Sequence, residues 1–316
     1  MKTIYDIIII GGGTAGMTAA IYGYRSGKDI LIIEKSFFGG QIISTSEVEN
    51  FPGFSSIKGY SFASELHQQI SAADISQAYD EVTSVRPSDG LWTVSCRKSS
   101  YSGRTVIIAV GTKNRKLGID GEERYTGHGL SYCATCDGAF YKNQSVAVVG
   151  GGSNALEEAL YLSLLCKTVY LIHRRDKFSG EHELQRRISE TENIKALFNT
   201  EVTGLHGNDR LEKLELSSAN AAVSGAENRD EKPTETLNIS GLFVAIGQIP
   251  QNEIFSQVVE IDSNGYIIAG EDCRTSAYGI FAAGDCRTKE LRQLVTAASD
   301  GAVAATEAIR LINKDL

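Results

Sequence analysis

The sequence predicts an α/β protein that contains two similar units. Two short apolar segments, residues 4–10 and 145–149, are each followed directly by a glycine-rich turn and by a segment typical of a helix. Continuous apolar runs of this length are typical of parallel strands that are buried on both faces. The chain also has 32 glycines and 4 prolines in 316 residues, which suits an α/β fold with tight turns between strands and helices. We therefore expect two Rossmann-like dinucleotide-binding domains.

The composition excludes several classes of protein. The chain carries 31 basic and 39 acidic side chains, a formal net charge of −8, whereas nucleic-acid-binding proteins usually have a basic surplus. No apolar run approaches the roughly 18 residues that a membrane-spanning helix needs. The first residues also lack the basic and long apolar regions of a signal peptide. We expect a cytoplasmic protein that binds neither nucleic acid nor membrane.

The first glycine-rich turn has the spacing of a dinucleotide-binding fingerprint. Gly11, Gly13 and Gly16 stand in a G-x-G-x-x-G frame between the strand expected at residues 4–10 and a helix expected at residues 17–24. In this context the first glycine permits the turn, the second lets the backbone approach a pyrophosphate, and the third lets the helix pack closely on the strand. A glycine-rich turn without a ligand is the alternative, but the flanking strand and helix favour a nucleotide site.

The next strand ends in an acidic residue. Residues 29–33 predict this strand, and Glu34 follows it directly. A carboxylate at this position of a βαβ unit accepts hydrogen bonds from ribose hydroxyls. The first unit is therefore suited to FAD or NAD.

The second glycine-rich turn repeats the pattern with an alanine in the third place. Gly150, Gly152 and Ala155 form a G-x-G-x-x-A frame between the strand at residues 145–149 and a helix expected at residues 156–165. The same physical argument applies to this turn, so we expect a second dinucleotide site.

The second unit carries basic residues where the first has its acidic one. Residues 168–172 predict a strand, and His173, Arg174 and Arg175 follow it. A carboxylate there would repel a ribose 2′-phosphate, whereas two guanidinium groups can hold it with charge-assisted hydrogen bonds. A solvated basic patch is the alternative. The position after a strand and opposite a glycine turn favours NADPH.

One pair of cysteines has the spacing of a redox centre. Cys133 and Cys136 form the only C-x-x-C segment, and Asp137 follows it. A zinc site would need further ligands at similar spacing, and the other cysteines and the histidines are scattered. Beside two dinucleotide sites, a pair that cycles between dithiol and disulfide is favoured. Asp137 can be the proton donor to a departing thiolate or a helix cap, and the sequence leaves both open.

Other conspicuous residues have simpler interpretations. Cys96 and Cys166 lie in apolar stretches and are expected to be small buried side chains, and Cys286 is expected to have a packing role. His128 is interpreted as a surface or loop residue. Residues 217–236 are rich in serine, alanine, asparagine and charge and predict an exposed hairpin or loop.

Further motifs along the chain resemble those of a known family. They lie at residues 39–41, 47–53, 109–112, 131–138, 149–152, 243–247, 281–285 and 292–298. Together they resemble the low-molecular-weight, bacterial-type thioredoxin reductases nearly from end to end. The Cys-Ala-Thr-Cys-Asp segment directly ahead of the second glycine turn is the most specific feature, because the larger disulfide reductases place their cysteine pair in the first domain.

The resemblance implies that the FAD-binding domain is split. Residues 1–113 and 246–316 would form this domain, and residues 114–245 would form an inserted NADPH-binding domain that carries the redox-active cysteines. The connectors at residues 112–115 and 246–249 are polar or contain glycine, as expected of hinges. A rotation of the inserted domain about them would alternately present the nicotinamide and the cysteines to the flavin.

The resemblance also implies a set of functional residues. Cys133, Cys136 and Asp137 would be catalytic, and no metal is expected. The FAD-binding residues would be Gly11, Gly13, Thr14, Ala15, Gly16, Glu34, Lys35, Gly40, Gln41, Asn50, Gly111, Asp285, Arg292, Gln293 and Val295. The NADPH-binding residues would be Gly150, Gly152, Ser153, Asn154, Ala155, Glu158, His173, Arg174, Arg175, Ile246 and Gly247.

The implied activity is an oxidoreductase activity toward thioredoxin. NADPH would reduce the FAD, two electrons would pass to the Cys133–Cys136 disulfide with Cys136 next to the flavin, and the dithiol would exchange with a disulfide of thioredoxin. A homodimer is expected. The alternatives are a reductase of another redoxin, a reductase with another electron donor, and a non-catalytic flavin or nucleotide sensor, which the intact cysteines and turns disfavour.

One position departs from the family pattern. The next arginine that the family has after its His-Arg-Arg run is replaced by Ser179. Arg174 and Arg175 remain, so NADPH should still be preferred over NADH. We expect this preference to be weaker than in a relative with the full motif, unless Lys177 or Arg186 takes the missing place.

Overall fold

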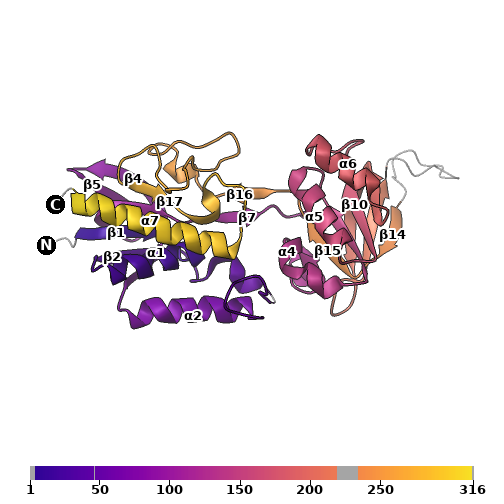
Figure 1. Cartoon of the computed structure of the whole chain (residues 1–316), viewed down its shortest axis with the longest axis horizontal. Helices are drawn as coiled ribbons and strands as arrows, with labels where there is room; N and C mark the ends of the chain where they lie inside the picture. Colours follow the sequence, from indigo (N-terminus) through magenta and orange to yellow (C-terminus); the bar gives the residue numbers. More distant parts are fainter. Residues whose placement is uncertain (1–3, 46, 219–233, 315–316) are drawn as a thin grey trace. The chain divides into compact units, whose positions relative to one another are not determined.

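The chain folds into two compact units in the computed structural model. The model describes residues 4–45, 47–218 and 234–314. Unit 1 comprises residues 1–113 and 249–316, and unit 2 comprises residues 114–248 (Figure 1). The chain passes between the units twice, and the two connecting segments, β7 (Thr112–Asn114) and β16 (Gln248–Pro250), pair as a two-stranded sheet. No helix within the described residues has both the length and the apolar character to cross a membrane.

Unit 1 is built on a seven-stranded sheet in the order β3-β2-β1-β6-β5-β4, with β17 also paired to β6. Its strands are β1 (Ile4–Ile10), β2 (Ile30–Glu34), β3 (Ser76–Tyr79), β4 (Val82–Ser88), β5 (Leu91–Cys96), β6 (Ser100–Ile108) and β17 (Ile280–Ala282). The pairs among β1, β2, β3, β6 and β17 are parallel, and those among β4, β5 and β6 are antiparallel. The central strand β1 is almost inaccessible from Ile7 to Ile10, as its apolar run predicts.

Small side chains let the first and the last helix of unit 1 approach closely. The helices of this unit are α1 (Thr14–Arg25), α2 (Gly59–Ala72), α7 (Leu294–Lys314) and the short 3₁₀ turns η1 (Gly40–Ser44), η3 (Glu253–Phe255) and η4 (Gly284–Cys286). Ala20 of α1 and Ala304 of α7 are fully buried in one core cluster. A Cβ at Gly301 would lie 2.1 Å from the backbone oxygen of Ala15. Helix α7 therefore supports the helix that follows the first glycine turn.

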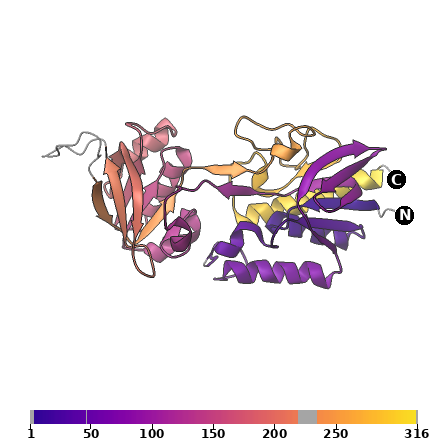
Figure 2. The ribbon, with the colours of Figure 1, turned by 180° about the vertical axis from the view of Figure 1, so that it is seen from behind.

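Unit 2 has a five-stranded parallel sheet with different layers on its two faces (Figure 2). The order is β11 (Ile194–Phe198), β10 (Thr168–His173), β9 (Ser145–Val149), β15 (Gly241–Val244) and β8 (Leu130–Ser131). On one face pack α5 (Ser153–Ser163) and α6 (His182–Glu190). On the other packs an antiparallel sheet of β12 (Thr200–His206), β13 (Lys213–Ser218) and β14 (Thr234–Asn238). The short helices are α3 (Glu122–Tyr125), α4 (Ala134–Asp137) and η2 (Gly138–Tyr141).

The strands and helices that the sequence predicts around both glycine turns are present, and their ends differ from the prediction by a few residues. Helices α1 and α5 begin at Thr14 and Ser153, earlier than expected, because the residues of the turn itself form the first helical turn. The segment expected as a hairpin or loop at residues 217–236 starts in β13 and ends in β14, which pair antiparallel. Residues 219–233 of that segment lie outside the described residues.

Candidate functional site

The first glycine turn leaves its backbone open at one residue only. Gly11 has φ of 110°, and a Cβ there would lie 2.3 Å from the oxygen of Ala109. A Cβ at Gly16 would lie 1.9 Å from the oxygen of Gly11, whereas one at Gly13 would meet nothing within 4 Å. The fold therefore requires glycine at the first and third positions. The second position offers free backbone at the N-terminus of α1.

No side chain caps the backbone N–H groups at the N-terminus of α1. Its N-cap, Gly13, has no capping side chain, and its first turn contains no acidic residue. Glu34 instead accepts hydrogen bonds from the backbone N–H groups of Gly12 (2.7 Å) and Ser36 (2.9 Å), at the end of β2. Each carboxylate oxygen keeps a second lone pair for a further donor. This end of the sheet thus offers N–H groups for a phosphate and a carboxylate for hydroxyl groups.

Residues far apart in the sequence surround this turn. A Cβ at Gly40 would lie 3.3 Å from the Cα of Gly13, and one at Gly284 would lie 3.0 Å from the Cβ of Ala15. The structure therefore gathers at one edge of unit 1 the expected residues of the first turn, of η1 and of η4. Lys35 is exposed directly after β2, and Gly111 directly precedes β7.

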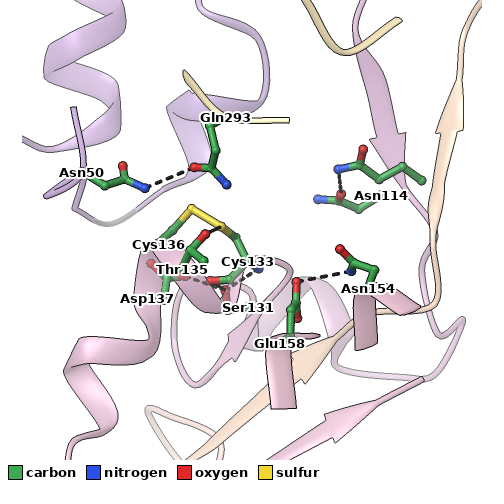
Figure 3. The surroundings of a disulfide bond; sticks show 11 residues. Asn50, Asn114, Ser131, Cys133, Thr135, Cys136, Asp137, Asn154, Glu158 and Gln293 are labelled. Carbon is green, nitrogen blue, oxygen red and sulfur yellow. Dashed lines mark hydrogen bonds between the residues drawn. A yellow bond between two sulfur atoms is a disulfide. The ribbon is translucent and has the colours of Figure 1, made fainter. Parts of the chain in front are cut away.

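Three further residues expected to bind FAD, Gln41, Asn50 and Gln293, form side-chain hydrogen bonds within unit 1. Gln41 donates to the backbone oxygen of Thr112 at 2.8 Å. Asn50 donates to the side-chain oxygen of Gln293 at 3.1 Å (Figure 3). Val295 lies in the first turn of α7 and is exposed.

Two buried polar atoms near η4 lack a partner. Neither Oδ1 of Asp285 nor Nε of Arg292 has a hydrogen-bond partner among the described residues. Burial raises the pKa of Asp285. The Arg292 guanidinium lies 4.1 Å from the centre of the Tyr266 ring. Unpaired buried polar groups are costly, so these two atoms fit a polar ligand at this site.

A buried ion cluster that the sequence did not reveal holds the turn before Asp285. Asp300 of α7 accepts from the backbone N–H of Gly284 (2.9 Å), from Nε and Nη2 of Arg287 (both 2.9 Å) and from Nζ of Lys289 (2.9 Å). Its pKa is lowered by these donors despite its burial. The charges are 13 and 11 residues apart in the sequence, so local patterns could not pair them.

The second glycine turn repeats the geometry of the first. A Cβ at Gly150 would lie 2.5 Å from the oxygen of Ala245, and one at Gly152 would meet nothing within 4 Å. Helix α5 likewise starts without a capping side chain and without an acidic residue in its first turn. The open backbone of Gly152 and the N-terminus of α5 are therefore suited to a second phosphate group. Ile246 and Gly247 follow β15 near the end of unit 2.

The three basic residues after β10 separate into two kinds. The His173 ring is 9 % exposed, packs where a Cβ of Gly151 would be, and lies 3.0 Å from the oxygen of Lys177 through Nε2. Burial lowers the pKa of His173, which favours the neutral form of the ring. Arg174 and Arg175 are exposed. The His173 ring therefore packs against the glycine turn at Gly151. The two arginines remain the candidates for binding a phosphate.

Ser179 folds back onto the second glycine turn. Its backbone N–H and that of Gly180 donate to the oxygen of Gly151 at 2.8 and 3.0 Å, and its hydroxyl donates to the same oxygen at 3.2 Å. Arg186 is held on its own helix by Glu183 and Glu190. Ser179 therefore lies directly beside the second glycine turn.

The cysteine pair forms a disulfide at the start of α4. Cys133 and Cys136 are joined, with their Cα atoms 5.3 Å apart. Among the described residues, no three or more histidine, cysteine, aspartate or glutamate side chains are grouped so that they could hold a metal ion.

The other cysteines are poor candidates for redox chemistry. Cys166, Cys273 and Cys286 are buried, as expected for Cys166 and Cys286, whereas Cys96 is only half-buried. Burial raises the pKa of Cys96, Cys166 and Cys286 to about 11 and that of Cys273 to about 12. Their thiols therefore stay protonated and weakly nucleophilic near neutral pH. His128 is exposed in a turn, as expected.

The Asp137 carboxyl is buried beside the disulfide and does not cap a helix. Although Asp137 precedes η2, it makes no capping hydrogen bond, so the helix-cap alternative is wrong. Its Oδ2 accepts from the Ser131 hydroxyl at 2.6 Å, and its Oδ1 is buried without a partner among the described residues (Figure 3). Burial raises the pKa of Asp137, and the Ser131 bond partly opposes this shift. Sequence reasoning missed Ser131, although it lies inside the motif at residues 131–138.

A second buried carboxyl lies on α5, the helix that follows the second glycine turn. Oε1 of Glu158 accepts from the Asn154 side chain at 3.4 Å, and Oε2 is buried without a partner among the described residues. Burial raises the pKa of Glu158 to about 7, and the backbone N–H of Ala134 at the start of α4 partly opposes this shift. The two acids are thus near both ends of the helix that carries the cysteines.

Comparisons with known proteins agree on one family. The model of the pyridine nucleotide-disulphide oxidoreductases matches residues 5–301. A thioredoxin reductase of Listeria monocytogenes is 40 % identical over 313 residues, 99 % of this chain and 95 % of its own length. One of Bacillus subtilis is 39 % identical over 305 residues, 96 % of this chain and 93 % of its own length. The crystal structure of thioredoxin reductase from Streptococcus pyogenes superposes with a TM-score of 0.92 at 36 % identity, covering 99 % of this chain and 100 % of that one.

Proposed function

The chain belongs to the pyridine nucleotide-disulphide oxidoreductase family, and from this premise we propose that it is a thioredoxin reductase. Electrons pass from NADPH through FAD and the Cys133–Cys136 disulfide to thioredoxin. The observation that carries this proposal is the disulfide at the start of α4 with a buried, raised-pKa carboxyl beside it, in the unit that also has an open glycine turn.

We assign FAD to unit 1. The open backbone of Gly13 and the uncapped N-terminus of α1 fit its pyrophosphate, and Glu34 fits a ribose. The unpartnered Asp285 Oδ1 and Arg292 Nε fit its polar groups. The hydrogen bond from the Gly284 N–H to Asp300 would fix the η4 turn and thereby the orientation of the Asp285 side chain toward the cofactor.

We assign NADPH to unit 2. Gly152 and the N-terminus of α5 would bind the pyrophosphate, and the exposed Arg174 and Arg175 would bind the 2′-phosphate. When bound, NADPH and FAD supply the hydride and the two-electron relay that no side chain provides.

The protein's own groups carry the disulfide chemistry. Uptake of two electrons breaks the Cys133–Cys136 bond, and two protons complete the dithiol. Asp137 gives one proton to the departing thiolate and later regains it, and solvent supplies the other. One thiol of the pair returns its proton to Asp137 and attacks the disulfide of thioredoxin as a thiolate, and the second sulfur, after losing its proton, resolves the mixed disulfide. That proton and one from solvent protonate the two sulfurs of thioredoxin. Thioredoxin leaves as a dithiol and the pair returns to the disulfide.

Two further assignments belong to the same proposal. We place the enzyme in the cytoplasm, where thioredoxin disulfides are reduced, and we expect a homodimer. Sedimentation of the purified holoenzyme tests the dimer, and a purely monomeric profile at all concentrations would contradict it.

The decisive experiment is NADPH-dependent reduction of a thioredoxin disulfide. The wild type should bind flavin, bleach with NADPH under nitrogen and reduce thioredoxin. Cys133→Ser and Cys136→Ser should still bleach but should not reduce thioredoxin, because reduction of the flavin does not need the thiols. A panel of other redoxins in the same assay separates thioredoxin from alternative substrates. Thioredoxin reduction by Cys136→Ser at the wild-type rate would show that the redox pair is wrongly assigned.

A further inference from the structure

The Ser131 hydroxyl lies between the cysteine backbone and the Asp137 carboxyl. Ser131 ends β8 and is 6 % exposed. Its Oγ is 2.6 Å from Oδ2 of Asp137, 3.1 Å from the backbone nitrogen of Cys133 and 3.3 Å from the backbone oxygen of Cys133. These contacts place one donor and two acceptors around a single hydroxyl group.

The three contacts can all be satisfied in either protonation state of Asp137. A hydroxyl has one proton to donate and two lone pairs to accept with. When Asp137 is ionised, Ser131 donates to Oδ2 and accepts from the Cys133 N–H. When Asp137 is protonated on Oδ2, Ser131 accepts that proton as well, and its own proton turns to the Cys133 oxygen. Only hydrogens need to move between the two states.

We propose that Ser131 is a positioning residue that holds Asp137 in both protonation states and sets the pH at which Asp137 releases its proton to the cysteine pair. This inference rests on the role of Asp137 in the proposed function. Ser131 touches no reacting sulfur through its hydroxyl in the described contacts, so it acts through Asp137.

The other titratable groups near Asp137 cannot replace this contact. Burial and the nearby Asp137 charge both raise the pKa of Tyr141 of η2, so its phenol stays neutral near pH 7. Glu158 of α5, the helix that packs against α4, is buried and titrates near neutral pH. The test must therefore separate the titration of Glu158 from that of Asp137.

The experiment uses the full-length protein and a readout that does not need NADPH. The pair is reduced with dithiothreitol, the reductant is removed, and the rate of thiol alkylation by iodoacetamide is followed against pH. The inflection that disappears in Asp137→Asn belongs to Asp137, and the one that disappears in Glu158→Gln belongs to Glu158. Steady-state reduction of thioredoxin by NADPH is then measured over the same pH range.

Ser131→Ala should move the Asp137 inflection upward by about one pH unit, because the hydrogen bond lost from the ionised carboxylate is stronger than the one lost from the protonated acid. The alkaline limb of thioredoxin reduction should shift in the same direction. Ser131→Thr keeps the hydroxyl and should restore both. In the Asp137→Asn background, Ser131→Ala should cause no further shift. Ser163→Ala, which removes a half-buried hydroxyl of α5, is the matched control.

Two results for the Asp137 inflection would contradict the proposal. An unchanged Asp137 inflection in Ser131→Ala, or a shift downward, would show that the hydroxyl has only a structural role. If Ser131→Ala does not fold by its thermal transition, Ser131→Val is compared with Ser131→Thr, because valine matches threonine in shape but lacks the hydroxyl. Failure of the wild type to reduce thioredoxin would overturn the proposed function instead, while the alkylation titration would still decide the link between Ser131 and Asp137.

Discussion

Asp137 combines burial with a single hydrogen-bond donor among the described residues, the Ser131 hydroxyl. Burial disfavours the ionised form, and the serine favours it, so the two effects oppose each other. Because burial is the larger effect, the pKa of Asp137 lies above its ordinary value. The residue can therefore hold a proton at a higher pH than an exposed aspartate and deliver it to a thiolate.

Asp137→Asn should retain flavin binding but slow the transfer of electrons to the disulfide. General acid catalysis contributes typically ~10²–10⁴-fold, so a loss of this order is expected, and it should ease at lower pH as solvent supplies the proton. The measurement is stopped-flow reoxidation of the NADPH-reduced enzyme by thioredoxin at several pH values. Asp209→Asn, an exposed aspartate of the same unit, is the control. A loss below about threefold at every pH would remove Asp137 from the mechanism.

Glu158 gives a prediction for stability. Its pKa is raised from an ordinary 4.5 to about 7 by burial, so the folded protein binds the proton more tightly than the unfolded chain. The contribution of the Glu158 proton to the free energy of unfolding is therefore complete below about pH 4.5 and is lost as the pH rises through about 7. Glu158→Gln should remove this loss and raise the free energy of unfolding by roughly 1–3 kcal/mol at pH 8, with little effect at pH 4. Thermal melts without NADPH at the two pH values measure it, and equal effects at both would contradict it.

At the scale of elements, the first and second glycines of each turn have different surroundings, and the difference is the same in both turns. In each turn the first glycine is required by contact with a neighbouring strand end, at Ala109 or Ala245, and the second has free space. The N-terminus of the following helix has no capping side chain in either case. We therefore expect folding and ligand binding to depend on different glycines of one motif.

This division predicts different effects for two neighbouring substitutions. Gly152→Ala should fold with an unchanged melting temperature but raise the KM for NADPH about tenfold to a hundredfold, because the methyl group occupies the space of a phosphate contact. Gly150→Ala should instead lower the melting temperature, since its Cβ would lie 2.5 Å from the Ala245 oxygen. Calorimetry and NADPH kinetics on both variants distinguish the cases. A normal KM in Gly152→Ala would mean that no phosphate binds there.

We expect the loop after β10 to determine the choice between NADPH and NADH. Ser179 lies against the Gly151 oxygen, and Arg186 is engaged by two glutamates of its own helix, so neither adds a positive charge to Arg174 and Arg175. Ser179→Arg should raise the ratio of kcat/KM for NADPH over NADH by about tenfold to a hundredfold, the worth of one charge-assisted hydrogen bond. Ser179→Gln is the uncharged control. An unchanged ratio in Ser179→Arg would show that another residue already fills this place.

At the scale of the whole molecule, local patterns predicted the elements around each glycine turn and the cysteine pair. These features depend on neighbouring residues, and the strands β1, β2, β9 and β10 are where the apolar runs indicate. The match of the family model and of the curated relatives confirms the resemblance. The cofactor and residue assignments that came with it stay predictions.

Other parts of the site could not be read from the sequence, because they depend on how the chain folds back on itself and not on a local pattern. The Asp300 carboxyl of α7 accepts from three groups in the η4 region that are 16, 13 and 11 residues away in the sequence. Asp137 loses its alternative role as a cap because β8 brings Ser131 to its carboxyl. His173 turns under the glycine turn rather than outward because the loop ending at Ser179 folds back. In each case the sequence shows the residue and only the fold shows its partner.

Each unit also has hydrophobic cores of its own. The clusters that join α5, α6 and β12–β14 to the sheet of unit 2 contain only residues of that unit, and those of unit 1 draw on both of its segments. Unit 2 is continuous in sequence, whereas unit 1 is assembled from two distant stretches. Unit 2 should therefore be able to fold without the rest of the chain.

A fragment of residues 114–248 should unfold in one cooperative transition and bind NADP⁺ with an affinity close to that of the full-length protein. Its Cys133–Cys136 disulfide should be reduced by dithiothreitol but not by NADPH, because the electron relay assigned to unit 1 is missing. Calorimetry, titration with NADP⁺ and thiol counting after incubation with NADPH measure the three properties, and Gly152→Ala in the fragment controls for specific binding. Thiols released by NADPH alone would place the whole electron path inside unit 2 and refute the assignment of the flavin to unit 1. A fragment without a cooperative transition would show that the cores of unit 2 depend on the segments of unit 1.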